Sequence, residues 1–219
     1  MPGEVIRTLS RRRLLLGTPA ALLVASGCTG LVRGRDPAPE PVAQGQAGPW
    51  RLRIAIFEMR SLGLPYHSGL LIDAPEGRIL YDPAGRWRHQ ECQRHADVHH
   101  PMTDTTVAAY LNRDGFGFAP ESWQLHLFEV EVPATVASRA HTLAIDRTPA
   151  PSLACTRSVA TLLSELDGFA DLRAHVVTAR LLSALQARPD LSYTTRIVPR
   201  AEARVAQQVE ARIVSPADG

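Results

Sequence analysis

The chain has 219 residues, of which 24 are basic and 22 acidic, so its formal charge is +2. So small a charge excludes the large basic excess typical of nucleic-acid-binding proteins, and a hydrophobic content of 45% is too high for a disordered chain. Three Cys are too few for a disulfide scaffold, and the absence of Lys excludes chemistry based on a Lys Schiff base or the Lys of a phosphate-binding loop.

The first residues have the composition of an export signal. Three consecutive Arg, at positions 11–13, precede an uncharged stretch from Leu14 to Gly27. This stretch is shorter than the ~20 residues that span a bilayer, and its charged start and small-residue end are typical of a secretory signal. The sequence Ser-Arg-Arg-Arg-Leu-Leu at residues 10–15 resembles a twin-arginine signal. We therefore expect residues 1–27 to be removed on export.

Cys28 follows the small residues Ala25, Ser26 and Gly27, an arrangement that resembles the lipobox of bacterial lipoproteins. The resemblance implies that Cys28 is lipidated and anchors the exported protein to the periplasmic side of the cell envelope. The alternative is an ordinary secretory signal that contains a Cys. Removal of residues 1–27 takes away four Arg and one Glu, which leaves 20 basic and 21 acidic residues and a net charge of −1.

Residues 28–49, which begin with the expected lipidated Cys, are rich in Pro, Gly, Ala and Gln and lack an apolar period. This composition predicts a flexible tether. The folded domain is then expected over residues 50–219. Its 170 residues are enough for a sizeable core without disulfides.

Three strands are expected at the start of the domain, over residues 52–59, 66–73 and 78–82. The first shows the alternation of a strand, whereas the second is continuously apolar beyond Gly69 and is predicted to be covered on both faces. The turn residues 74–77, Ala-Pro-Glu-Gly, join the second and third strands into a hairpin.

The rest of the domain is predicted to contain helices and one more strand. Residues 85–102 are polar and rich in His and are expected to be irregular, after which Thr103 can cap a helix. Ser152 is expected to cap a later helix, which Gly168 would stop. A strand is expected over 123–132, and helices over 133–144, 153–166, 178–186 and 200–213. These elements predict an α+β domain, with a small, mostly antiparallel sheet packed against helices.

Cys155 is the candidate nucleophile. It lies in the first turn of the helix expected after Ser152, on the stripe that also carries Val159 and Leu166. A helix N-terminus favours a thiolate over a thiol, because its free N–H groups and positive dipole end stabilise negative charge. Two alternatives stay open: Cys155 as a buried small hydrophobe, or a disulfide with Cys92 that export would permit.

His67 and Asp82 are the candidate partners of Cys155. If Asp73 pairs with Arg78 across the hairpin turn, Asp82 lies opposite Gly69 and diagonal to His67, and their side chains share one face of the sheet. A carboxylate there could hold the imidazole in the tautomer that a general base requires. A one-residue bulge in the turn would move Asp82 to the other face.

Three short segments carry a family resemblance: residues 66–72 (Tyr-His-Ser-Gly-Leu-Leu-Ile), 79–85 (Ile-Leu-Tyr-Asp-Pro-Ala-Gly) and 154–159 (Ala-Cys-Thr-Arg-Ser-Val). Their order resembles that of circularly permuted papain-fold hydrolases, which are relatives of the NlpC cell-wall peptidases and include lecithin:retinol acyltransferase-like enzymes. The resemblance spans roughly residues 52–185.

The resemblance implies a papain-like fold and a cysteine hydrolase. Cys155 would attack an amide or ester carbonyl, His67 would move the proton, Asp82 would orient His67, and no cofactor would be needed. In an exported lipoprotein the first substrate class is a peptide amide of the cell wall, and the second is a lipid ester or amide.

Two further functions remain open from the residues. Zinc accepts N and S ligands, and a His-rich stretch offers five potential ligands within twelve residues, although their spacing matches no standard zinc finger. The set considered is His89, Cys92, His95 and His99, with His100 next to it in the chain. The other possibility is a catalytically silent module that binds the wall or a partner protein, because a fold can persist after its activity is lost.

Overall fold

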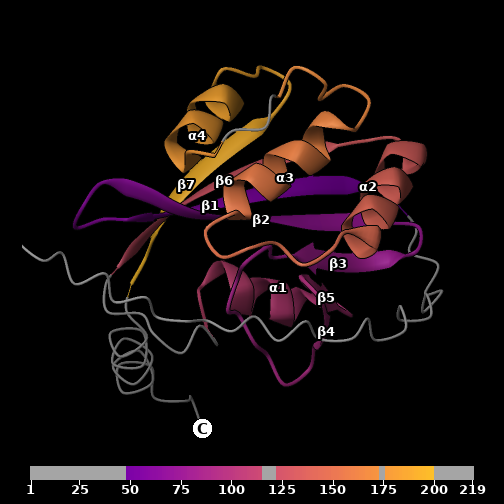
Figure 1. Ribbon diagram of the computed structural model, residues 1–219, viewed down its shortest axis with the longest axis horizontal. Coiled ribbons are helices and arrows are strands. Elements are labelled where there is room, and N and C mark those ends of the chain that lie inside the picture. The colour runs from indigo at the N-terminus through magenta and orange to yellow at the C-terminus, as the bar shows by residue number, and fades with distance from the viewer. Residues whose placement is uncertain (1–47, 115–121, 173–175, 200–219) are drawn as a thin grey trace, which may run out of the picture. The chain divides into compact units, whose positions relative to one another are not determined.

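The computed structural model describes residues 48–114, 122–172 and 176–199. These residues form one antiparallel seven-stranded sheet with the order β4-β5-β3-β2-β1-β6-β7, together with four helices (Figure 1), so the predicted α+β class is confirmed. The strands are β1 (Arg51–Met59), β2 (Leu64–Ala74), β3 (Gly77–Tyr81), β4 (Gln93–His95), β5 (Val98–His100), β6 (Trp123–Glu131) and β7 (Ser192–Val198). The helices are α1 (Asp104–Leu111), α2 (Ala134–Asp146), α3 (Cys155–Ser164) and α4 (Thr178–Gln186).

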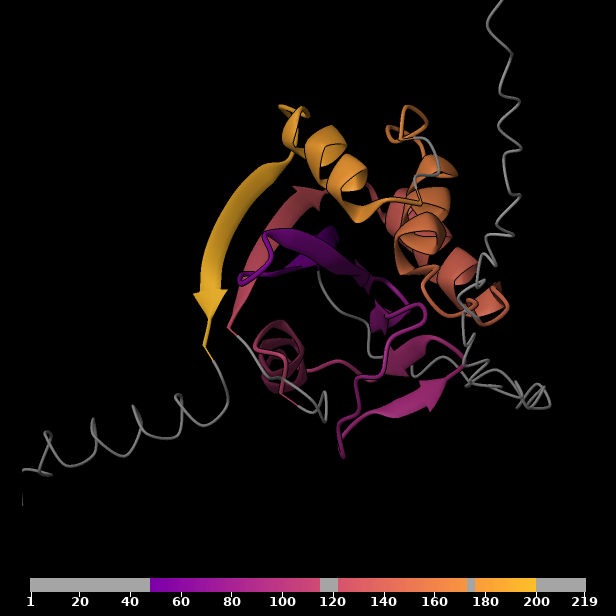
Figure 2. The same cartoon turned by 60° about the vertical axis from the view of Figure 1, so that its left-hand side comes forward.

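Helices lie on both faces of the sheet, with α1 on one side and α2, α3 and α4 on the other (Figure 2). The core under α2–α4 contains Leu70 and Leu163, and the core under α1 contains Leu71 and Tyr110. Since neighbouring residues of a strand point to opposite faces, Leu70 and Leu71 are fully buried in different cores. The continuous apolar run of β2 therefore marks a strand covered on both faces, as predicted.

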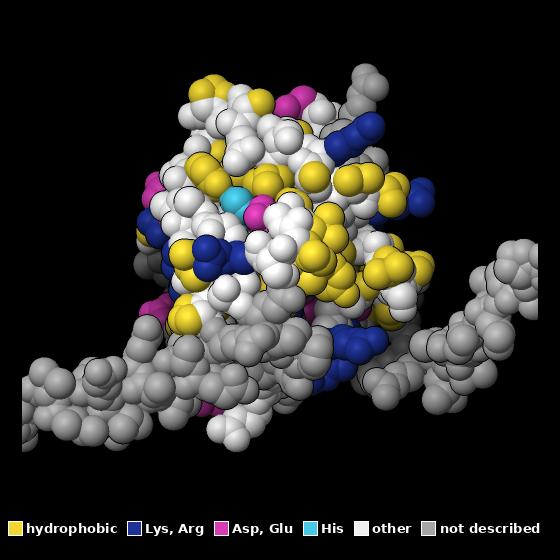
Figure 3. All heavy atoms as spheres, turned by 90° about the vertical axis from the view of Figure 1, so that its left-hand side faces the viewer, with side chains coloured by type: hydrophobic (Ala, Val, Ile, Leu, Met, Phe, Trp, Pro, Cys, Tyr) yellow, Lys and Arg dark blue, Asp and Glu magenta, His cyan; other side chains and the backbone are white. Residues whose placement is uncertain are grey.

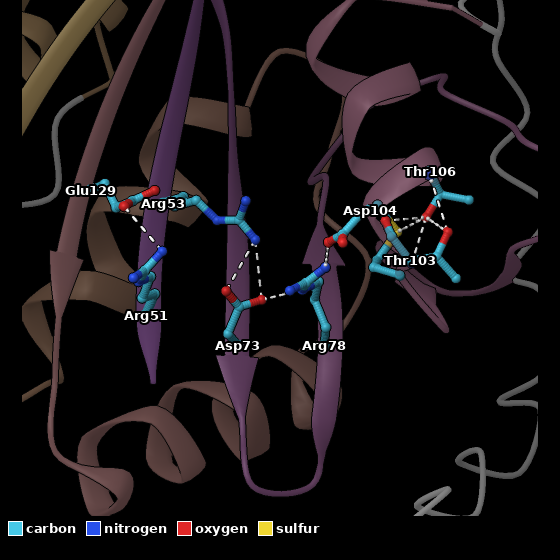
Figure 4. A network of polar contacts seen from close by, with 9 residues as sticks. Arg51, Arg53, Asp73, Arg78, Thr103, Asp104, Thr106 and Glu129 are labelled. Carbon is cyan, nitrogen blue, oxygen red and sulfur yellow. Dashed lines mark hydrogen bonds and ion pairs between the residues drawn. The ribbon is translucent and has the colours of Figure 1, made fainter. Parts of the chain in front are cut away.

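The register of the β2–β3 hairpin is the predicted one, with Asp73 paired to Arg78 and Leu71 to Leu80. Buried charges reinforce it (Figure 4): the Asp73 carboxylate accepts hydrogen bonds from Arg53 at 3.1 Å and from Arg78 at 2.5 Å. Arg78 also donates to Asp104, the first residue of α1. These ion pairs fix the hairpin turn and tie α1 to the sheet.

The helices differ from the predicted ones mainly at the start of α3. It begins at Cys155 instead of residue 153, because Leu153 has a left-handed φ of 67°, which a helix cannot contain. Ala154 occupies the N-cap position without a side-chain hydrogen bond, so the expectation that Ser152 caps this helix is wrong. Thr103 caps α1 as predicted, in a reciprocal capping box with Thr106 (Figure 4).

Three strands escaped prediction. Residues 85–102 were expected to be irregular but contain β4 and β5, which are too short and polar to show a period. β7 extends the sheet beyond β6, and its exposed, largely polar residues gave no alternation. The expected signal, most of the tether and the helix over 200–213 lie outside the described residues. In the described part of the chain, no helix combines the length and apolar character needed to cross a membrane.

Candidate active site

Cys155 is the first residue of α3 and is 7% exposed. Its sulfur lies 4.0 Å from the carbonyl oxygen of Tyr66 and accepts a hydrogen bond from the backbone N–H of Ser68. Both groups belong to the part of β2 that extends past β3, since β3 ends at Tyr81, opposite Leu70. The N-terminus of α3 therefore places the thiol at the stretch of β2 that β3 leaves uncovered.

The His67 ring and the Asp82 carboxylate are in direct contact. Nε2 of His67 lies 2.6 Å from Oδ1 of Asp82, and both side chains are buried. The register of the hairpin produces this contact, because Asp82 directly follows Tyr81 and points to the same face as Leu80. Asp82 also forms a turn in which the Gly85 N–H donates to its backbone carbonyl, so one residue serves both the turn and the site.

The Cys155 thiol and the His67 ring lie close enough for each to shift the pKa of the other. Nε2 of His67 is engaged by Asp82, so Nδ1 is the ring nitrogen left to exchange a proton with the sulfur. The ring of Phe57 is stacked on His67, with centroids 6.3 Å apart, and holds the imidazole plane. The structure thus brings the three predicted residues together, with the His67 ring in contact with the carboxylate and near the thiol.

The charges of Asp82, His67 and Cys155 together favour a thiolate–imidazolium pair. Burial alone lowers the pKa of His67, but the charge and hydrogen bond of Asp82, together with Cys155, raise it to about 9. Burial raises the pKa of the Cys155 thiol, whereas the hydrogen bond and charge of His67 and the Ser68 N–H lower it to about 7. Between these two values the sulfur is an anion and the ring is a cation.

Tyr110 is a residue of the site that sequence reasoning missed. Its hydroxyl, which α1 presents to the sheet, donates to Oδ1 of Asp82 over 3.0 Å. The hydroxyl occupies the space beside Gly69, where a Cβ would lie only 2.1 Å from it. A Cβ on Gly85 would similarly lie 1.7 Å from Oδ2 of Asp82. The two glycines were the available signal, since each marks a close approach by a polar side chain of the site.

A further buried histidine, His99, lies close enough to Asp82 for the two charges to interact. Burial lowers the pKa of His99 to about 4, although the charge of Asp82 acts in the opposite direction, so His99 is neutral at physiological pH. Burial raises the pKa of Asp82, but the charge and hydrogen bond of His67 and the hydrogen bond of Tyr110 lower it below its usual value. The carboxylate is therefore charged although it is fully buried.

Two alternatives from the sequence find no support in the geometry. Cys92 and Cys155 are both free thiols, so the disulfide between them is excluded. Among the residues that the structure describes, no three His, Cys, Asp or Glu side chains are grouped as metal ligands would be. The zinc ligands considered in the His-rich stretch are therefore not assembled as a set: His89, Cys92, His95 and His99. Cys92 instead approaches the carbonyl of Pro101 at 3.3 Å.

No protein-family model matches the chain, and no curated protein or solved structure is significantly similar to it.

Proposed function

We propose that this protein is an exported cysteine hydrolase that cleaves an amide or ester in the bacterial cell envelope through Cys155, His67 and Asp82. The observation that carries the proposal is the buried His67–Asp82 contact of 2.6 Å beside the Cys155 thiol at the N-terminus of α3, with pKa values that favour a thiolate beside an imidazolium. The order of these residues along the chain supports assignment to the circularly permuted papain-like hydrolases. Lipidation at Cys28 and location at the periplasmic side of the envelope remain part of the proposal.

The chemistry is acyl transfer to sulfur followed by hydrolysis. The Cys155 thiolate attacks the carbonyl carbon and forms a C–S bond, and the leaving amine or alcohol takes the proton from Nδ1 of His67. His67, now neutral, removes a proton from water, which attacks the thioester and releases the acid. The Cys155 thiolate leaves and the protonated His67 is restored, so the sum is acyl compound plus water to acid plus amine or alcohol.

The N-terminus of α3 would stabilise the negative oxygen of the tetrahedral intermediate. The first N–H groups of a helix lack intrahelical partners, and the backbone N–H of Cys155 is the first of these in α3. Because the nucleophile and this donor belong to the same residue, the attacked carbonyl comes within reach of both. Asp82 keeps His67 oriented and charged, with Tyr110 as its second support.

A peptide amide of the cell wall is the first proposed substrate class, following the family resemblance and the expected export. A lipid ester is the second, and one observation favours it: Leu153, two residues before Cys155, is 80% exposed, and the side chain of Tyr66, whose carbonyl oxygen lies 4.0 Å from the thiol sulfur, is also exposed. Large apolar side chains at a site entrance suit an acyl chain.

The proposal is tested by alkylation, with Cys92 as an internal control. In the mature chain with Cys28→Ser at pH 7.5, we expect iodoacetamide to modify Cys155 at least about tenfold faster than Cys92, whose thiol pKa burial raises. The His67→Gln variant should reduce the rate at Cys155 and leave the rate at Cys92 unchanged.

Hydrolysis of purified muropeptides and of short-chain lipid esters would then identify the substrate class, with Cys155→Ala as the inactive control. Equal alkylation of the two thiols in the unaltered protein, or a Cys155 rate that His67→Gln does not affect, would overturn the proposal.

A further inference from the structure

Exposed apolar side chains gather around the thiol. The structure exposes eight large apolar side chains among its described residues, and six of them lie on three segments that meet at Cys155. These six residues, which we call the apolar rim, are Leu62, Leu64, Tyr66, Leu153, Val176 and Val177. Figure 3 shows the face toward which the β1–β2 turn points, and apolar side chains cluster on its surface.

Two contacts bring the three segments together. The carbonyl of Tyr66 lies 4.0 Å from the sulfur of Cys155, which joins the start of β2 to the N-terminus of α3. The hydroxyls of Thr156 and Thr178 lie 2.7 Å apart, which joins the N-terminus of α3 to that of α4, where Val177 is the N-cap residue. The apolar rim is therefore one surface feature, assembled from segments that lie far apart in the sequence.

The charges of these segments are of one sign. Residues 59–66, 151–164 and 176–186 contain Arg60, Arg157 and Arg180, all exposed, and no Asp or Glu. The whole chain, by contrast, has nearly as many acidic as basic residues. Apolar side chains beside unopposed Arg are the pattern of surfaces that bind at a bilayer interface, where the apolar groups enter the acyl region and the Arg side chains reach anionic head groups.

We propose that the apolar rim, together with Arg60, Arg157 and Arg180, docks this face of the domain on the surface of a bilayer that contains anionic phospholipids. A second copy of the chain suits the surface less well, because a two-fold interface would place the same Arg side chains against one another. The lipid expected on Cys28 would act with the rim, since a tether of about twenty residues holds the domain within roughly 70 Å of the membrane. Docking would turn the N-terminus of α3, which carries Cys155, toward the lipid surface.

Flotation of the unlipidated protein with vesicles tests the docking independently of any activity. The probe is the expected mature chain, residues 28–219 with Cys28→Ser, mixed with vesicles of phosphatidylcholine alone or of phosphatidylcholine and phosphatidylglycerol in equal parts. We expect binding to the mixed vesicles, weakened by salt. The pair Leu62→Asn and Leu153→Asn should lower the partition coefficient by at least about tenfold, because each change removes a large apolar side chain from the contact. Asn suits the left-handed φ of Leu153.

Matched controls separate docking from misfolding. Val132→Asn replaces a partly buried apolar residue that follows β6 and lies beside Trp50, just before the start of β1 and away from the β1–β2 turn. This variant should bind vesicles like the unaltered chain. Arg157→Gln should weaken binding to the mixed vesicles, whereas Arg139→Gln, on the exposed side of α2, should not. Each variant must keep the circular dichroism spectrum and the urea midpoint of the unaltered chain. The proposal is overturned if the protein does not float with the vesicles, or if the rim variants float as well as the unaltered chain. It is also overturned if sedimentation shows that the protein associates with itself through the rim, which would assign the rim to a second copy of the chain.

Discussion

At the scale of single residues, the site depends on a carboxylate that stays charged without any contact with water. Asp82 is 0% exposed, and burial of an uncompensated carboxylate would neutralise it. His67 and Tyr110 both donate to its Oδ1, and their effect on its pKa outweighs that of burial. Because the Asp82 charge raises the pKa of His67, and the His67 charge lowers the pKa of Cys155, the charge state of Cys155 depends on a carboxylate with which it has no direct bond.

The first prediction concerns Asp82→Asn, which removes the charge and keeps the side-chain size. With Asp82 intact, the rate of Cys155 alkylation should rise with pH through a midpoint near 7, and the hydrolysis rate should fall again above about 9, where His67 loses its proton. In Asp82→Asn, burial lowers the pKa of His67, and the thiol pKa rises because its cationic partner is lost. We expect the alkylation midpoint to move up by roughly one pH unit or more and hydrolysis to fall by about 10²–10⁴-fold.

The control for this prediction is Asp146→Asn, an exposed residue at the end of α2, which should leave both pH limbs in place. An alkylation midpoint that stays near 7 in Asp82→Asn would show that the carboxylate does not set the charge of His67.

From the sequence the three candidate residues could be named, whereas Tyr110 was missed and His99 was considered only as a zinc ligand. Cys155 was marked by its position before a helical apolar stripe, and His67 and Asp82 by the alternation and register of one hairpin. These are local patterns that a single segment contains. Tyr110 reaches Asp82 only because α1 packs across the sheet at that height, and no spacing within residues 103–111 encodes this placement.

At the scale of elements, Gly69 sets how closely α1 can approach β2. The second prediction follows from the Cβ that Gly69 lacks, which would lie 2.1 Å from the Tyr110 hydroxyl and 3.1 Å from the ring carbon that bears it. We expect Gly69→Ala to lower the free energy of unfolding by about 2–3 kcal/mol, as overpacking does, and to raise the Cys155 alkylation midpoint, because Tyr110 would lose its place at Asp82. In a Tyr110→Phe background the same change should cost at least about 1 kcal/mol less.

Urea denaturation of the four proteins in this double-mutant cycle measures the coupling. Tyr81→Phe is the matched control background, since Tyr81 contacts Gly69 through its backbone carbonyl, and there Gly69→Ala should keep its full cost. Additive costs of Gly69→Ala and Tyr110→Phe would show that the hydroxyl does not determine the need for glycine.

How far the elements could be predicted depended on their length and pattern. The long strands β1, β2 and β6 follow from alternation or apolar runs, and α4 begins and ends at the predicted residues. The start of α3 was placed two residues early, because nothing about a leucine signals the left-handed φ of Leu153. β4 and β5 are stabilised by tertiary pairing with β3 and lack an apolar pattern of their own.

At the scale of the whole described domain, one sheet is shared by two cores, and the site joins them. Cys155 belongs to the layer of α3, whereas His67 lies beside Phe57 on the face that α1 covers. The two groups meet where β2 extends past β3. The thiol and the imidazole are therefore held by different cores, and the distance between them depends on both.

The third prediction is that this domain unfolds as a single unit and that both cores protect the site. Leu80 lies in the core under α1 and Leu163 in the core under α2–α4, and both are fully buried. Leu80→Ala and Leu163→Ala should each lower the free energy of unfolding by about 2–5 kcal/mol, because each leaves a cavity. Urea denaturation measures this. The loss of circular dichroism and the exposure of Cys155 to a bulky thiol reagent should share one midpoint in the unaltered protein and in each variant.

Arg139→Gln is the control and should leave both midpoints unchanged. The contrary outcome is that, in Leu163→Ala alone, Cys155 becomes exposed at lower urea than the loss of circular dichroism. That result would show that the α3 layer detaches from the sheet, and that Cys155 and His67 are held by separate folding units.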